Sequence, residues 1–235
     1  MENRRIWEID LLRTIAIILM VVFHVIYDLN QFFGVKIEYL SGFWYWEGRA
    51  AALIFIFLAG ISSGFSRNTV RRGLQVFSFG MAITLVTYIL FDEQYIRFGI
   101  LHLLGTAMIL FPLLKKINNI LLFMSAAGIV FTGMVMKNTL AATSLLLPLG
   151  VRYKGFISLD YYPLCPFLMV FILGILAYKM FYYARQSLFS FGFENKYILL
   201  ISKNSLLIYL IHQPLVIGLI FLLQHICGGN YGLRS

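Results

Sequence analysis

The sequence predicts an all-α membrane protein, a bundle of seven transmembrane helices in a single domain over residues 1–235. Hydrophobic residues make up 60% of the chain and charged residues only 12%, whereas soluble domains average roughly 25% charged residues. Apolar runs of about 20 residues, long enough to cross a bilayer, recur along almost the whole chain. These runs leave no room for a separate soluble domain.

The first three spans are expected at residues 6–30, 49–66 and 73–91. Between the first two, the run FWYW predicts an interfacial loop, because aromatic rings gather where lipid meets water. The second span ends in the small residues of LAGISSG, which allow close packing of helices. The basic turn RNTVRR then leads into the third span.

The four remaining spans are expected at residues 98–114, 118–136, 163–183 and 201–226. The turn KKINN follows the first of these, and prolines interrupt the start of the third. Before that interrupted span, the run LAATSLLLPLGV is too short to cross a bilayer. It predicts a surface helix or a lid.

Lys and Arg are distributed unevenly over the expected loops, and this predicts the orientation of the chain. With the N-terminus inside and the C-terminus outside, the dense basic clusters at 67–72 and 115–116 lie on the inner side, as the positive-inside rule requires. The net charge of +9 is then expected to serve an anionic leaflet or an anionic ligand, and not nucleic acid.

The first span, IWEIDLLRTIAIILMVVFHVIYDLN, carries the ionisable residues Asp10, Arg13, His24 and Asp28 along its length. At ~100° per residue they fall within about 60° of one another around the helix. Because ionisable groups are costly in hydrocarbon, this stripe must face protein or water. It is therefore the expected working site.

The stripe divides into two pairs. Asp10 and Arg13 have the i,i+3 spacing of a structural ion pair, although Arg13 is also suited to holding an anionic cofactor. His24 lies about 16 Å further along the helix, and Asp28 one turn beyond it could fix the imidazole tautomer and leave the other nitrogen as a base. The alternative is a buried histidine satisfied by a neighbouring carbonyl or hydroxyl.

Two further histidines lie in expected spans. His102 opens the fourth span, and His212 lies midway along the last, on one face with Ser205 and Tyr209. Three intramembrane histidines that can meet in one bundle favour a common catalytic site. No span has the His and Glu spacing of a metal site, so no metal is expected unless separate helices supply the ligands.

Five stretches of the chain resemble the heparan-alpha-glucosaminide N-acetyltransferase catalytic-domain family, whose members include small bacterial proteins. They are EIDLLRTIAIILMVVFHVIYDL, FIFLAGISSGFSR, RFGILHLLGTA, DYYPLCPFLMVFILGILAY and NSLLIYLIHQPL, which occur in this order and are spread over most of the chain, from Glu8 to Leu215. The opening D-x-x-R followed by an intramembrane His also resembles the wider group of membrane acyltransferases that act on sugars.

The resemblance implies transfer of an acetyl group from cytosolic acetyl-CoA to an acceptor on the opposite side of the membrane. In the lysosomal members that acceptor is a terminal glucosamine amine, whereas here a saccharide or lipid-linked glycan at a bacterial plasma (inner) membrane is expected. The CoA phosphates are expected at basic residues near the inner surface, namely Arg13, Arg67, Arg71, Arg72, Lys115 and Lys116.

The family's lysosomal branch places its catalytic histidine in the long loop after the first helix. This chain has no histidine between His24 and His102, so His24, oriented by Asp28, is expected to take that role as general base. His102, Tyr209 or His212 could donate a hydrogen bond to the oxyanion. A covalent acetyl-histidine is the alternative mechanism.

Two other classes of function stay open. Charged and histidine-bearing stripes also build proton relays, so a small transporter or proton-coupled carrier is one alternative. A non-catalytic membrane partner subunit is the other. The expected partners are membrane lipids and the acceptor, and a homo-oligomer is compatible with the sequence.

Overall fold

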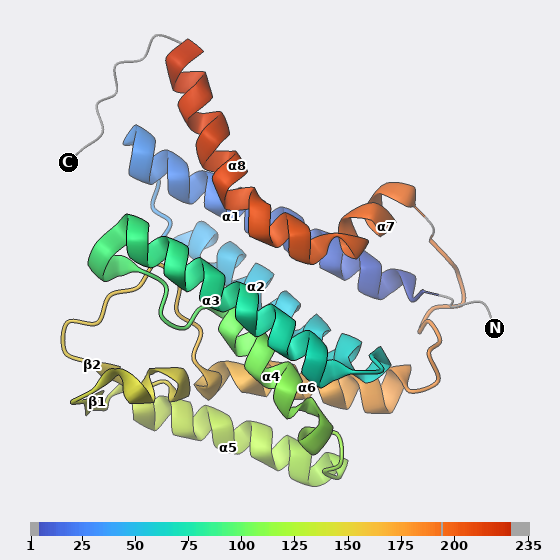
Figure 1. The fold of residues 1–235 in the computed structure, drawn as a ribbon. Helices are drawn as coiled ribbons and strands as arrows, with labels where there is room; N and C mark the ends of the chain where they lie inside the picture. Colours follow the sequence, from blue (N-terminus) through green and yellow to red (C-terminus); the bar gives the residue numbers. More distant parts are fainter. Residues whose placement is uncertain (1–4, 194, 227–235) are drawn as a thin grey trace. The chain divides into compact units, whose positions relative to one another are not determined.

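The computed structural model describes residues 5–193 and 195–226, and over these residues the chain is all-α (Figure 1). Its helices are α1 (Trp7–Phe33), α2 (Gly42–Phe65), α3 (Thr69–Phe91), α4 (Ile100–Leu114), α5 (Asn119–Lys137), α6 (Leu164–Ala177), α7 (Lys196–Lys203) and α8 (Ser205–Ile226). Short 3-10 turns lie at Asp92–Gln94 and Ser144–Leu149, and a π-helical turn at Tyr178–Tyr182 continues α6.

Among the described residues, six helices are long and apolar enough to cross a membrane. They are α1, α2, α3, α5, α8, and α6 together with its π-helical turn. The fourth expected span, 98–114, corresponds to α4, a shorter apolar helix of 15 residues. The last expected span is divided, since α7 ends at Lys203 and α8 begins at Ser205.

Helix α2 begins seven residues earlier than expected, so the prediction of an interfacial loop at FWYW is wrong. Gly42 starts the helix with a φ of 65°, a left-handed conformation that glycine adopts without steric cost. No proline follows to interrupt the helical hydrogen bonds. The aromatic residues and Glu47 therefore belong to the first turns of α2.

The chain divides into two compact units, 1–55 with 189–235 and 56–188. The first unit contains α1, the first half of α2, α7 and α8, with α8 lying along α1. Its core is formed by Ile17, Met20 and Ala51, with Ile208 and Tyr209 of α8 packed against them.

The second unit contains the rest of α2 and α3 to α6, arranged around two antiparallel pairs, α3 with α4 and α5 with α6 (Figure 1). Glycines bring the backbones together. A Cβ atom added to Gly73 of α3 would lie 2.8 Å from the carbonyl oxygen of Gly105 on α4. Between α2 and α6, a Cβ atom at Gly60 would clash with the Phe171 carbonyl, and one at Gly174 with the Phe57 carbonyl. These contacts agree with the close packing that LAGISSG predicts.

The segment between α5 and α6 folds onto the start of α4. Strands β1 (Leu140–Ala141) and β2 (Arg152–Tyr153) pair in parallel, and the 3-10 turn at Ser144–Leu149 lies between them. The Asp160 carboxylate accepts the Ile100 backbone N–H at 3.0 Å, while burial raises the pKa of Asp160 to about 6. The segment expected to form a surface helix or a lid thus contains a short 3-10 helix, and the Asp160 side chain attaches the segment to α4.

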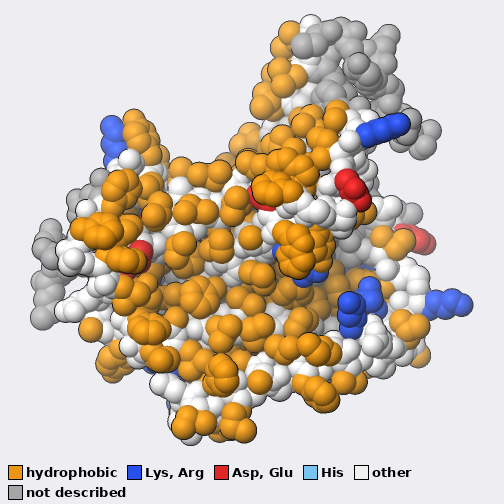
Figure 2. Space-filling model, turned by 180° about the vertical axis from the view of Figure 1, so that it is seen from behind, with side chains coloured by type: hydrophobic (Ala, Val, Ile, Leu, Met, Phe, Trp, Pro, Cys, Tyr) orange, Lys and Arg blue, Asp and Glu red, His pale blue; other side chains and the backbone are white. Residues whose placement is uncertain are grey.

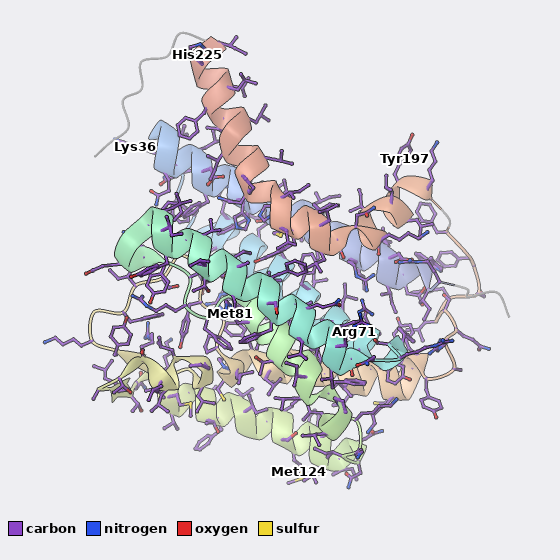
Figure 3. All side chains as sticks on the ribbon, in the orientation of Figure 1. Lys36, Arg71, Met81, Met124, Tyr197 and His225 are labelled. Carbon is purple, nitrogen blue, oxygen red and sulfur yellow. The ribbon has the colours of Figure 1, made fainter. Side chains whose placement is uncertain are left out.

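The surface of the second unit is suited to contact with lipid. Met81 on α3 and Met124 on α5 (Figure 3) leave 49% and 63% of their surface exposed. Figure 2 shows hydrophobic side chains over most of the face that it displays. Apolar surface on this scale is typical of a protein whose solvent is hydrocarbon.

Leucine in place of Gly174 should destabilise the second unit, because α2 and α6 meet there backbone to backbone. Overpacking of a tight contact costs about 1–3 kcal/mol. We expect a lower midpoint of thermal unfolding in detergent, followed by circular dichroism. Gly128→Leu is the matched control, since no atom lies within 4 Å of a Cβ added there. Equal midpoints for the two variants would contradict the close contact.

Candidate functional site

Two imidazoles face each other in the first unit, His24 on α1 and His212 on α8. Their ring centroids are 4.6 Å apart and the rings are nearly perpendicular, at 77°. His212 is buried and His24 is partly buried. The structure thus brings together two of the three histidines that the sequence suggested, through the packing of α8 along α1.

Backbone carbonyls determine the tautomers of both rings. The Nδ1 atom of His24 lies 2.8 Å from the Met20 carbonyl oxygen, and Nδ1 of His212 lies 2.6 Å from the Tyr209 carbonyl oxygen. A carbonyl can only accept, so each Nδ1 carries a proton and donates it. In the neutral rings each Nε2 is therefore left with its lone pair, and that of His212 has no partner among the described residues.

Asp28 does not orient His24 as the sequence suggested. Its Oδ1 atom accepts a hydrogen bond from Nε2 of Gln213 on α8, at 2.9 Å. The acceptor that orients His24 is the carbonyl one turn before it, and not the carboxylate one turn after it. The difference arises because α8 supplies an amide donor for Asp28. That donor, Gln213, lies 185 positions further along the sequence. Asp28 is nonetheless fully buried, and its partner Gln213 is the residue that follows His212.

Several buried polar atoms of the first unit have no hydrogen-bond partner among the described residues. They are Oδ2 of Asp28, Oε1 of Gln213, Nε2 of His212 and both carboxylate oxygens of Glu47. With the carboxylates ionised and Nε2 of His212 unprotonated, each of these atoms can accept a hydrogen bond and none can donate one. Because unpaired buried polar groups are costly, this region favours a ligand that supplies N–H or O–H donors.

Glu47 is the site candidate that sequence reasoning missed. It is 8% exposed, and the next residue, Gly48, packs against the ring of Phe23, which in turn contacts the ring of His24. One turn later on α2, Ala51 belongs to the same core as Met20. A lone carboxylate within an apolar run could have identified Glu47 from the sequence. It was missed because that run was expected to form a loop and not a helix.

The N-terminal end of α1 carries a network around Asp10. Arg5 donates two hydrogen bonds to the Asp10 carboxylate, at 2.7 and 2.9 Å, and this pairing raises the pKa of Arg5. Ser202 of α7 donates to Asp10 and accepts from Arg13 at 3.0 Å. The Arg13–Asp10 distance itself is 3.7 Å. Arg13 and Asp10 thus tie α1 to α7 through Ser202, while Arg5 pairs with Asp10.

His102 lies in the second unit with both ring nitrogens occupied. Its Nδ1 accepts the Gly99 backbone N–H at 3.2 Å, so Nε2 carries the proton and faces the Thr84 hydroxyl at 3.3 Å. The side chain is 2% exposed and caps the start of α4. This bonding leaves neither nitrogen available as a base, and we interpret His102 as a structural residue.

The predicted cofactor cations of the second unit are exposed at the ends of its helices: Arg67, Arg71, Arg72, Lys115 and Lys116. Figure 3 labels Arg71 at the start of α3. Two cations that the prediction missed lie in the segment that ends α6. Lys179 donates to the Ile117 carbonyl at 2.6 Å, and Arg185 lies over the Phe65 ring at 5.9 Å.

An aromatic ring joins these basic segments. Lys115 lies 5.6 Å from the centre of the Tyr178 ring, and Tyr178 stacks edge-on against Phe65 at the end of α2. No Asp or Glu occurs between Glu93 and Asp160, which both belong to the opposite ends of these helices. The basic ends thus form a region of uncompensated positive charge that suits phosphate groups.

Over the described residues, no three His, Cys, Asp or Glu side chains are close enough together to hold a metal ion.

Comparison with known proteins gives one informative match. Residues 5–214 match the family model described as heparan-alpha-glucosaminide N-acetyltransferase, catalytic. This range contains both facing histidines, Asp28 and Gln213. Comparisons with curated proteins and with solved structures give no match.

Removal of the Ser202 hydroxyl should weaken the attachment of α7 to α1. Ser202→Ala takes one donor from the buried Asp10 carboxylate and one acceptor from Arg13, at a cost of roughly 1–3 kcal/mol. Thermal unfolding in detergent measures the loss. Ser78→Ala is the control, because among the described residues the exposed Ser78 hydroxyl bonds to the Leu74 carbonyl of its own helix alone. An unchanged midpoint for Ser202→Ala would show that the network is not stabilising.

Proposed function

Because the chain belongs to the heparan-alpha-glucosaminide N-acetyltransferase catalytic-domain family, we propose that it is an integral-membrane acetyltransferase acting on a sugar. The donor is acetyl-CoA, and the acceptor is a hydroxyl or amine of a saccharide or lipid-linked glycan. The observation that carries the proposal is the facing pair His24 and His212, each with Nδ1 tied to a carbonyl and Nε2 left as an acceptor.

In the proposed mechanism His24 is the general base. Its Nε2 accepts the proton of the acceptor hydroxyl or amine as that atom attacks the thioester carbonyl carbon. The C–S bond then breaks, and the proton passes from His24 to the departing sulfur. The Met20 carbonyl holds the ring through Nδ1, so the proton enters and leaves at one nitrogen only.

His212 takes a different role in this scheme from the one the sequence suggested. Its Nε2 has a lone pair and no proton, so the neutral ring cannot donate to an oxyanion. We assign it to binding the acceptor, together with the unpaired oxygens of Asp28 and Glu47. The Tyr209 hydroxyl, whose ring lies 5.6 Å from that of His212, is the remaining candidate oxyanion donor.

Acetyl-CoA, when bound, supplies the activated carbonyl. Its phosphates match the uncompensated cations at the start of α3 and the ends of α4 and α6, with Arg71, Arg72 and Lys115 as the principal residues. With the N-terminus inside, these residues face the cytosol of a bacterial cell and the acceptor binds from the outer side of the plasma membrane. Arg13 contacts Ser202 and Asp10, so we assign it mainly a structural role and only a secondary role in binding acetyl-CoA.

Loss of the base should abolish transfer without unfolding the protein. We expect His24→Ala to lower kcat for acetyl transfer by about 10²–10⁴-fold, measured with radiolabelled acetyl-CoA and membrane glycan as acceptor. His225→Ala is the matched control, because His225 is exposed near the end of α8 (Figure 3). A normal rate for purified His24→Ala would refute the assignment of the base.

Buried unpaired carboxylates are also compatible with a proton-coupled carrier. Charge reversal at the basic turn distinguishes the two functions, because only the enzyme needs to bind acetyl-CoA. The double variant Arg71→Glu, Arg72→Glu should raise the Kd for acetyl-CoA at least tenfold, since charged contacts with phosphate are lost. The control reverses two cations away from the basic turns, Lys137→Glu at the end of α5 and Lys154→Glu after β2. Absence of saturable acetyl-CoA binding to the wild-type protein would favour the carrier.

A further inference from the structure

A polar cavity lies in the second unit. It has a volume of about 550 Å³ and is bounded by the end of α3, the residues before α4 and the segment around β1 and β2. Its polar lining consists of Thr84, Tyr95, Arg97, Thr143, Ser144 and Tyr153. No step of the proposed acetyl transfer uses any of these residues.

Arg97 is the charged group of this cavity, and its charge is uncompensated. One guanidinium nitrogen donates to the Ile157 carbonyl at 2.6 Å, and no carboxylate of the described residues forms an ion pair with it. A guanidinium has five N–H donors in a planar fork, so most remain available. The nearby Asp160 carboxylate is directed to the Ile100 N–H of α4 and does not line the cavity.

Aromatic rings hold the Arg97 guanidinium in place. It lies 4.2 Å from the centre of the Tyr95 ring and 5.8 and 5.6 Å from those of Tyr153 and Phe156. Stacking on aromatic faces orients a guanidinium and reduces the entropy lost when it binds. The side chain is thus prepared for a planar, two-pronged contact with an oxyanion.

Hydroxyl groups and aromatic faces complete the lining. Thr143 and Ser144 are exposed and offer hydroxyls that can both donate and accept, while the Thr84 hydroxyl donates to the Ile96 carbonyl at 2.7 Å and faces Nε2 of His102 at 3.3 Å. Tyr95 and Tyr153 present rings to the same space. A ligand that fills it must combine negative charge with hydroxyl groups and a face that can lie on an aromatic ring.

We propose that this cavity is a binding site for a phosphate group attached to a polyhydroxylated ring. Arg97 binds the phosphate oxygens, Thr143 and Ser144 exchange hydrogen bonds with the ring hydroxyls, and Tyr95 and Tyr153 pack against the ring. A free sugar phosphate and the headgroup of a phosphoinositide-like lipid share this chemistry. The site is independent of the proposed acetyl transfer.

The test is a binding titration of the full chain in phosphatidylcholine nanodiscs. Glucose 1-phosphate is titrated calorimetrically, glucose serves as the uncharged probe, and in a parallel arm phosphatidylinositol is included in the nanodisc and its retention on the protein is measured by mass spectrometry. Saturable binding of glucose 1-phosphate identifies a soluble ligand, and selective retention of phosphatidylinositol alone identifies a lipid headgroup. Binding of neither, or equal binding of glucose, overturns the proposal.

Variants assign the binding to the cavity. Arg97→Gln should weaken it at least tenfold, whereas Lys154→Gln, which removes a neighbouring exposed charge outside the lining, should leave it unchanged. If Arg97→Gln does not fold, the double variant Thr143→Val, Ser144→Ala tests the same cavity through its hydroxyls. Binding that survives these changes and is lost in Arg71→Glu, Arg72→Glu would place the phosphate at the basic turns and refute the site.

Discussion

The hydrogen bond between each histidine of the first unit and a carbonyl of its own helix is the constraint on which the proposed chemistry depends. His24 donates to Met20, and His212 donates to Tyr209. Each carbonyl is fixed by its helix, so the ring orientation follows from the backbone of α1 or α8. The same bond decides which nitrogen holds the proton, and therefore where a lone pair is presented to a substrate.

The rest of the first unit supports this pair in two ways. Asp10, Arg13 and Ser202 join the start of α1 to α7, far from the histidines along the helix. Near the histidines, Gln213 engages one oxygen of Asp28 and leaves the other unpaired. One end of α1 is thus fully paired and anchoring. The other end retains unpaired acceptors, which is the arrangement expected where a ligand completes the hydrogen bonding.

Spacing along one helix predicts which residues share a face, but it does not predict their hydrogen-bond partners. The sequence places Asp10, Arg13, His24 and Asp28 on one face, yet Asp28 pairs with a residue of α8 that no local rule identifies. The alternative reading of His24, a ring satisfied by a neighbouring carbonyl, describes its Nδ1 atom. It is compatible with catalysis, because the second nitrogen stays available.

Helix positions were largely predictable from hydropathy, while boundaries at aromatic runs were not. The run FWYW is equally compatible with an interfacial loop and with the first turns of a helix, so Glu47 was overlooked. His102 was grouped with the other histidines on composition alone. Its capping bonds with Gly99 and Thr84 depend on how the loop before α4 folds. The family resemblance, carried by five stretches, is confirmed over residues 5–214.

The most direct test of the account is the protonation of the two rings themselves. Solid-state ¹⁵N NMR of histidine-labelled protein in lipid bilayers distinguishes Nδ1–H from Nε2–H tautomers, and difference spectra with His24→Gln and His212→Gln assign the signals. The account predicts that both rings are neutral, with the proton on Nδ1 and an unprotonated Nε2. A proton on Nε2 of His24 in the resting protein would contradict it, because that nitrogen could not then accept a proton from the acceptor.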